Sequence, residues 1–134
     1  MQNTLAEKYN LTANPENPTV DGEDLDKRPP DYTAFRLDPQ VRPSNALIDF
    51  WLSDGDQRAF SYSHLYDVEF RRSEGLIITF SEHQVLVQGR MLDDLHSSLK
   101  RHRAVFVWEA SSQDGMLAGE DQPIVTKIDI QTRS

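Results

Sequence analysis

The residues that could do chemistry in this chain begin with four histidines, His64, His83, His96 and His102. None stands in an HxH or HExxH arrangement, and the six-residue spacing of His96 and His102 would set their side chains about 240° apart on a helix. A zinc pair on a helix needs a spacing of three or four residues, and the chain has no cysteine to supply thiolates. We therefore expect no metal ion and no cofactor.

One histidine has a neighbour that could assist catalysis. His64 stands three positions before Asp67, whose carboxylate could orient the imidazole as the general base of a small hydrolase. A turn histidine that caps a backbone group is the simpler interpretation. The GxSxG, GxGxxG and GxxxxGK[ST] motifs are absent, which removes the usual signatures of serine hydrolases and glycine-rich phosphate loops. We assign no catalytic residues and favour a non-enzymatic protein.

Basic residues offer a second kind of chemistry, the binding of an anion. Six of them follow strands or end the expected helix: Arg71, Arg72, Arg90, Lys100, Arg101 and Arg103. Together they could hold an anionic ligand or RNA, with nearby aromatic side chains stacking on bases. The alternative is that they complement the helix C-terminus and pair with neighbouring acids.

Composition argues against several partners. Lys and Arg number 14 against 22 Asp and Glu, so the formal net charge is −8, which repels nucleic-acid phosphates and anionic membranes. No apolar run approaches the ~20 residues that span a bilayer, and residues 1–20 lack a signal peptide's basic and apolar regions. We expect a cytoplasmic protein that binds no membrane, and this charge argues against a nucleic-acid partner.

The first 43 residues differ from the rest of the chain. They hold six of the seven prolines and eight acids against five bases, including the acid-rich run Asp21–Asp26. Such a segment buries too little apolar surface to fold alone, so we predict an extended acidic Pro-rich arm over 1–43. Residues 31–37 within it carry apolar side chains that could dock on the remainder. We expect 44–134 to form a single domain.

A period of two begins at Ala46 and predicts antiparallel hairpins. In the first hairpin, a three-residue Ser53–Gly55 loop pairs Phe50 with Arg58 and keeps the large side chains on one face, with Gly55 at positive φ. A two-residue loop would turn them to opposite faces. We therefore favour the three-residue loop.

The next strands follow the same alternation. A three-residue loop over 73–75 pairs Phe70 with Ile78, again with a glycine where the backbone needs positive φ. The following connection has no Gly or Asn, so we expect a four-residue loop that pairs Phe80 with Val85. Together with the first hairpin, this makes a run of five strands.

After these strands the period becomes helical. Leucines recur at i, i+3 and i+7 from Leu92, which predicts an amphipathic helix of about three turns. Residues 104–109 read as a strand covered on both faces, 111–123 as a loop, and 124–130 as a final edge strand. The fold class we predict is α+β: an antiparallel β-meander of about five strands with one packed helix and one or two further C-terminal strands.

The meander would carry a second apolar face, opposite the main one. Its most prominent residues are Leu47, Trp51, Ile77 and Leu86. Large exposed apolar patches mark interaction surfaces, so the arm, the last strand or a second copy of the chain should cover it. The leading hypothesis is a protein-interaction or self-association module. Such a module would form a homo-oligomer or bind a protein partner.

Several stretches also carry a resemblance. They are FSYSHLYDVEF from Phe60, IITFSEH from Ile77, VQGRML from Val87, and the pair His102-Arg103. This text resembles a group of small bacterial proteins of unknown function that share an ITFSxHxVxVxG…L…HR pattern, which implies one compact unit and no activity. At the level of topology, a meander followed by a helix is similar to part of pleckstrin-homology-like and Sm-like barrels.

Overall fold

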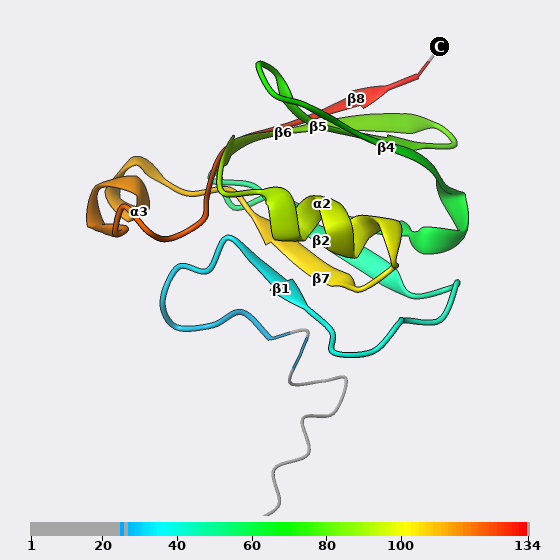
Figure 1. Cartoon of the computed structure of the whole chain (residues 1–134), viewed down its shortest axis with the longest axis horizontal. Helices are drawn as coiled ribbons and strands as arrows, with labels where there is room; N and C mark the ends of the chain where they lie inside the picture. Colours follow the sequence, from blue (N-terminus) through cyan, green and yellow to red (C-terminus); the bar gives the residue numbers. More distant parts are fainter. Residues whose placement is uncertain (1–24, 26, 134) are drawn as a thin grey trace, which may run out of the picture.

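The computed structural model of the chain describes residue 25 and residues 27–133 (Figure 1). The acid-rich run, apart from residue 25, and the first 20 residues of the predicted arm lie outside them. One four-stranded sheet has the spatial order β1 (Phe35–Leu37), β7 (Ala104–Trp108), β2 (Leu47–Trp51), β3 (Gln57–Ser61). The other has the order β4 (Leu65–Arg71), β5 (Gly75–Phe80), β6 (His83–Arg90), β8 (Ile124–Thr132). Two α-helices complete the described part of the chain, α2 (Asp93–Lys100) and α3 (Ser112–Leu117).

The α+β class is confirmed, but the single five-stranded meander is wrong. A 3-10 turn, Tyr62–His64, separates β3 from β4 and carries the chain from one sheet to the other. The Ser61 hydroxyl accepts a hydrogen bond from the Ser63 N–H at 3.1 Å, which caps this turn. Tyr62 is buried and its hydroxyl donates to the Ala104 carbonyl at 2.6 Å. The turn is therefore fixed into the core.

The core lies between the two sheets and is closed by α2 (Figure 1). The Phe60 and Phe80 rings stack at 4.6 Å across the two sheets, and Phe50 meets Phe80 edge-on at 6.4 Å. The leucines predicted to face the sheet are buried at Leu92, Leu95 and Leu99. Helix α2 contacts β4 of one sheet and both β1 and β7 of the other. This confirms the packed helix, although its eight residues make about two turns rather than the predicted three.

The first hairpin has the predicted register. Phe50 pairs with Arg58, and Ile48 pairs with Phe60. Gly55 has φ +100°, as the three-residue loop requires. The main apolar face of β2 and β3 therefore points into the core.

The next two registers differ from the prediction by two residues. Phe70 pairs with Leu76 rather than Ile78, and Val85 pairs with Ile78 rather than Phe80. Gly75 has φ +111° but belongs to β5, where it pairs with Arg71. A Cβ at this position would lie 2.4 Å from the Val87 carbonyl oxygen, so the close strand pairing requires glycine. The connection between β5 and β6 is therefore shorter than the predicted four residues. A shift of two keeps every side chain on its face.

Strand β7 is covered on both faces, as predicted. It pairs in parallel with β2 and antiparallel with β1, so the segment before residue 44 supplies a strand. On the outer face, Trp51 stacks on Phe106 at 4.1 Å, and the Arg28 guanidinium lies 4.7 Å from the Trp51 ring. Leu25 packs against the same cluster. Residues preceding β1 therefore cover Trp51.

The C-terminus of α2 ends in a residue with positive φ that a neighbouring ring supports. His102 has φ +56° and follows α2, while the Arg103 N–H bonds to the Ser98 carbonyl at 2.8 Å, a Schellman arrangement built on a non-glycine residue. The Tyr62 ring stacks on His102 at 4.6 Å and supports it.

The predicted loop over 111–123 is partly helical, which corrects that prediction. Ser111 and Asp114 form a capping box at the start of α3, and six residues follow as helix. The last strand is an edge strand, as predicted. No helix among the described residues is both long and apolar enough to cross a lipid bilayer.

Candidate functional site

The predicted interaction face does not exist as one surface. Leu47 and Trp51 lie on the sheet of β1, β7, β2 and β3, whereas Ile77 and Leu86 lie on the other sheet. Each pair points away from the shared core, because its strand neighbours fill that core. Trp51 is 4% exposed beneath the segment before β1, and Ile77 and Leu86 are half-buried. The 3-10 turn at Tyr62–His64 is the cause of this division.

The predicted basic residues are also spread over the structure. Arg71 lies on the sheet surface and forms ion pairs with Glu69 at 2.8 Å and Glu74 at 3.3 Å. Arg72 lies in the turn that follows. These contacts are the local pairing that the sequence offered as the alternative to an anion site.

The other four basic residues lie elsewhere. Arg90 ends β6 and donates to the carbonyl oxygens of residues 119 and 122. Arg103 donates from Nε to the Asp38 carbonyl at 2.7 Å. Lys100 ends α2 and Arg101 is its C-cap. Arg71, Arg90 and Arg103 therefore have separate contacts, and the six residues lie on different elements rather than in one described site.

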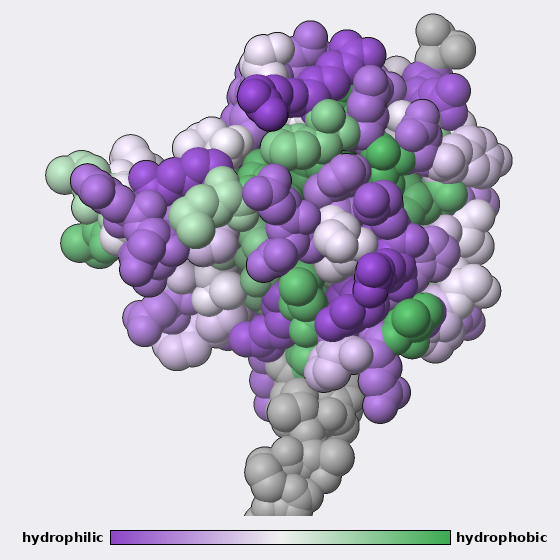
Figure 2. All heavy atoms as spheres, viewed as in Figure 1, coloured by the Kyte–Doolittle hydropathy of each residue, from purple (hydrophilic) through white to green (hydrophobic). Residues whose placement is uncertain are grey.

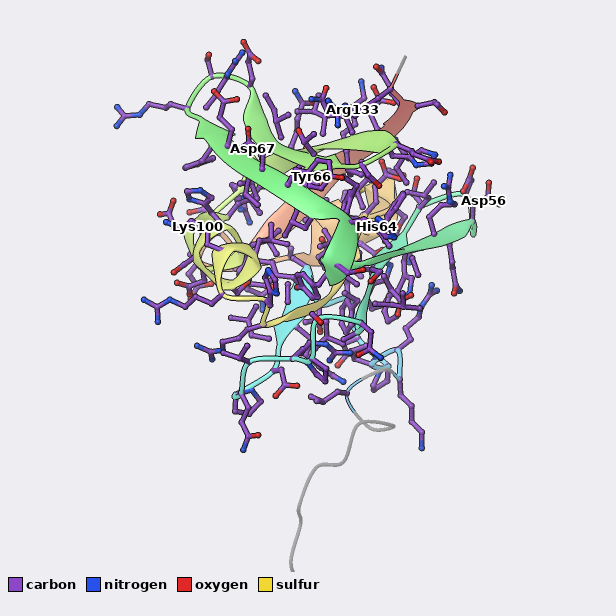
Figure 3. The ribbon with its side chains drawn as sticks, turned by 90° about the vertical axis from the view of Figure 1, so that its right-hand side faces the viewer. Asp56, His64, Tyr66, Asp67, Lys100 and Arg133 are labelled. Atoms are coloured by element: carbon purple, nitrogen blue, oxygen red, sulfur yellow. The ribbon has the colours of Figure 1, made fainter. Side chains whose placement is uncertain are left out.

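The predicted pairing of His64 with Asp67 does not form. The Nδ1 atom of His64 lies 3.1 Å from the Ser81 hydroxyl oxygen, while Asp67 belongs to the exposed part of β4. Figure 3 shows His64 at the turn and Asp67 further along the ribbon. No carboxylate orients this imidazole among the described residues, which removes the proposed general base.

The feature that stands out is the free edge of β4. This strand is an outer strand of its sheet, seven residues long, and five of the seven are exposed. Tyr66 is 67% exposed and Phe70 is 41% exposed. In the described part of the chain, no other strand pairs with this edge. Unpaired backbone N–H and C=O groups on such an edge can pair with another extended chain.

A hollow adjoins the C-terminal end of β4. Its volume is about 200 Å³, and Phe70, Met91 and Leu92 contribute its apolar part. The imidazole of His96, on α2, lies 5.6 Å from the Phe70 ring. Partial burial lowers the pKa of His96, the charge of Lys100 lowers it further, and Asp93 opposes both. A neutral ring therefore faces Phe70 at neutral pH.

The opposite edge of the same sheet, β8 (Ile124–Thr132), is closed over residues 125–128. The Val125 N–H donates to the Tyr32 hydroxyl at 2.9 Å, and the Ile128 N–H donates to Glu109 Oε2 at 2.8 Å. The Val125 carbonyl accepts from the Ala110 N–H at 2.8 Å. Side chains and backbone from outside the sheet thus occupy half of this edge.

Tyr32 is held in its neutral form at this edge. Burial raises its pKa to about 12, with a smaller lowering by the Val125 bond and further raising by Asp114 and Glu109. The protonated hydroxyl also donates to the Trp108 carbonyl at 3.0 Å. Tyr32 therefore links β7 of one sheet to β8 of the other.

Sequence reasoning missed the open edge because it placed β4 inside a continuous meander. The signal that could have revealed it is the Ser61–His64 stretch, which interrupts the alternation between the two hairpins. Exposed apolar side chains on α3 were missed as well. Met116 is 84% exposed and Leu117 is 78% exposed, and Figure 2 shows green side chains on that protruding segment at the left.

Metal ligation and relatives add no further site. In the part of the chain that the structure describes, no three histidine or carboxylate side chains gather closely enough to hold a metal ion. No family model, curated protein or solved structure matches the chain. The resemblance to small bacterial proteins stays a prediction.

Proposed function

We propose that this chain is a non-enzymatic protein-interaction module that binds an extended segment of a partner protein along β4. The observation that carries the proposal is the unpaired, largely exposed edge of β4 beside α2. Adding a strand to an open edge gives affinity through backbone hydrogen bonds, and side-chain pockets next to the edge give specificity. The hollow beside Phe70 is such a pocket.

The side chains of β4 define the chemistry of that segment. Asp67 and Glu69 are both exposed, and Glu69 already shares its charge with Arg71. Opposite charges directly across a strand pair are favourable. The bound segment is therefore extended, basic at alternate positions, and carries one apolar side chain for the hollow beside Phe70. A chain of net charge −8 would also attract a basic partner at long range.

A second copy of the chain fits this edge less well. Two β4 strands related by a two-fold axis perpendicular to the sheet can be centred on Asp67, Val68 or Glu69. Centring on Asp67 places that acid opposite itself, and centring on Val68 places Asp67 opposite Glu69 twice. Centring on Glu69 places Glu69 opposite itself and Asp67 opposite Arg71 twice, a pairing that competes with the existing ion pair of Glu69 and Arg71. Like charges directly opposite destabilise a strand pair. The segment before β1 also covers Trp51, which removes the reason for self-association there.

The test is selection of peptides from a random displayed library against the full chain. We expect enriched peptides to lack proline, because proline cannot donate a backbone hydrogen bond to β4. We expect them to carry Lys or Arg at alternate positions, because these side chains would lie opposite Asp67 and Glu69. Asp67→Lys should weaken binding of these peptides at least about tenfold through like charge across the pair. Leu117→Ser is the control, because Leu117 is also exposed but lies on α3.

Two outcomes would contradict the proposal. One is that Leu117→Ser abolishes peptide binding while Asp67→Lys leaves it unchanged, which would move the site to α3. The other is a solution mass by light scattering that shows a stable dimer, with the dimer lost in Asp67→Lys or Tyr66→Ser. That result would assign β4 to self-association instead.

A further inference from the structure

A second hollow lies where β3 approaches the turn between β5 and β6. Its volume is about 290 Å³. Its polar lining comes from three separate segments of the chain and consists of Arg58, Ser61, His64, Ser81, Glu82 and His83. None of these residues belongs to β4, so the hollow is independent of the proposed partner site.

Two hydrogen bonds fix the imidazoles at this hollow. Arg58 Nη2 lies 3.3 Å from His83 Nε2, and since a guanidinium only donates, that nitrogen accepts and the His83 proton sits on Nδ1. The Ser81 hydroxyl lies 3.1 Å from His64 Nδ1, and when it donates, the His64 proton sits on Nε2. Each ring therefore retains one N–H donor.

The backbone holds these groups in place. The Ser81 N–H donates to the His64 carbonyl at 2.9 Å, so the two residues are joined through main chain and side chain. His64 ends the 3-10 turn, which Tyr62 anchors in the core (Figure 3). The donors are therefore arranged before any ligand arrives, which lowers the entropy cost of binding.

Arg58 supplies the positive charge in the lining of this hollow. A second guanidinium, that of Arg133, lies outside the lining and donates from Nη1 to the Phe80 carbonyl at 3.0 Å. Glu82 is the one carboxylate in the lining. Arg58 lies over the Phe60 ring at 5.1 Å, a contact that limits its rotamers. The guanidinium fork matches the oxygens of a phosphate group.

We infer that this hollow binds a small tetrahedral oxyanion, either free phosphate or a phosphate monoester, through Arg58 and His64. Arg58 supplies the charge and its remaining N–H groups, and the Nε2–H of His64 supplies a further donor, while the Ser81 hydroxyl keeps His64 in that tautomer. A phosphate group has three strong acceptor oxygens for such a set. The site makes no covalent bond to the ligand.

The test follows histidine ring signals by NMR in the full chain, at neutral pH and constant ionic strength, during titration with inorganic phosphate. We expect the signals of His64 and His83 to shift with saturation, and those of His96, on α2, to stay in place. Arg58→Gln should weaken binding at least about tenfold, because it removes a charge-assisted hydrogen bond. Arg101→Gln is the control, since Arg101 is an exposed arginine at the end of α2.

A parallel titration with phosphoserine separates the two sources of the ligand. Tighter binding of phosphoserine assigns the site to a monoester, and equal or weaker binding assigns it to free phosphate. Equal shifts with chloride at the same ionic strength would overturn the inference, as would equal affinities of Arg58→Gln and the parent chain. Neither result depends on a peptide binding at β4.

Discussion

The two outer strands of one sheet, β4 and β8, differ in whether their outward backbone groups have hydrogen-bond partners. On β8, the Tyr32 hydroxyl and the Glu109 carboxylate accept the outward N–H groups of Val125 and Ile128. On β4, five of the seven residues are exposed, and no described residue pairs with the free edge. The chain therefore closes one edge with specific side chains and leaves the other open.

This difference between β4 and β8 suggests that one strand edge contributes to stability and the other to binding. Glu109 also accepts the Ser53 N–H at 2.7 Å, so one carboxylate holds backbone from both sheets. Contacts at β8 join the two halves of the fold, whereas the exposed side chains of β4 make only local contacts, such as the ion pairs of Arg71 and the ring contact of Phe70 with His96. Substitutions at β8 should therefore cost folding free energy, and substitutions at β4 should cost binding.

The largest effect should come from Gly89, where β6 meets β8. A Cβ at Gly89 would lie 1.9 Å from the Ile124 carbonyl oxygen, so Gly89→Ala forces the two strands apart. We expect the free energy of unfolding to fall by about 2–3 kcal/mol, measured by urea denaturation. Gly115→Ala is the control, because nothing lies within 4 Å of its Cβ position, and it should be neutral or slightly stabilising.

The next largest effect should come from Glu109. Glu109→Ala leaves the N–H groups of Ser53 and Ile128 without their carboxylate acceptor, so we expect a loss of about 2 kcal/mol. Glu109→Gln keeps an acceptor oxygen and should lose less. Glu120→Ala, at an exposed position after α3, is the control. A loss equal to that of the control would mean that water replaces the carboxylate and that β8 is not held by it.

A smaller effect should appear at alkaline pH. The pKa of Tyr32 is about 12 in the folded chain against 10.0 in the unfolded chain, so the folded state holds this proton more tightly. The stabilisation is complete below pH about 10 and is lost as pH rises toward about 12. Tyr32→Phe should therefore be less stable at neutral pH by about 1 kcal/mol and lose less stability between pH about 10 and about 12. Parallel pH profiles for the two proteins would contradict the role of Tyr32.

The smallest effect on stability should come from the open edge. Tyr66→Ser changes a side chain that is 67% exposed, so we expect the free energy of unfolding to change by less than about 0.5 kcal/mol. Affinity for the selected peptides should fall markedly, because aromatic side chains beside an edge contribute to strand addition. A large loss of stability with unchanged affinity would reverse the assignment of the two edges.

Local pattern was sufficient for most strands, for α2 and for one register, but not for β1 or α3. Alternation and Gly55 fixed the first hairpin, since a shift by one residue would turn Phe60 away from Phe50. The leucine spacing from Leu92 likewise gave α2. The second hairpin was off by two residues because a period of two is unchanged by that shift. There the deciding contact is the approach of Gly75 to Val87, which is absent from the local sequence.

The arrangement of sheets and the binding edge depend on contacts between distant residues. The parallel pairing of β2 with β7 and the docking of β1 on β7 join segments that lie far apart in the sequence, as in the pairs Asp49 with Phe106 and Phe35 with Val107. The proposed basic site failed for the same reason, because Asp38 and the carbonyls near Gln122 reach Arg103 and Arg90 only in the folded chain. Which strand is left at an edge follows from these pairings alone.

Hydrogen exchange of individual backbone amides, with and without a selected peptide, tests strand addition at β4 most directly. In the free chain, we predict slow exchange at Val125 and Ile128 on β8 and fast exchange at the outward amides of β4. With the peptide bound, alternate β4 amides should become protected, while β8 stays unchanged. Binding that leaves the β4 amides in fast exchange, or protects β1 or β3 instead, would contradict the account.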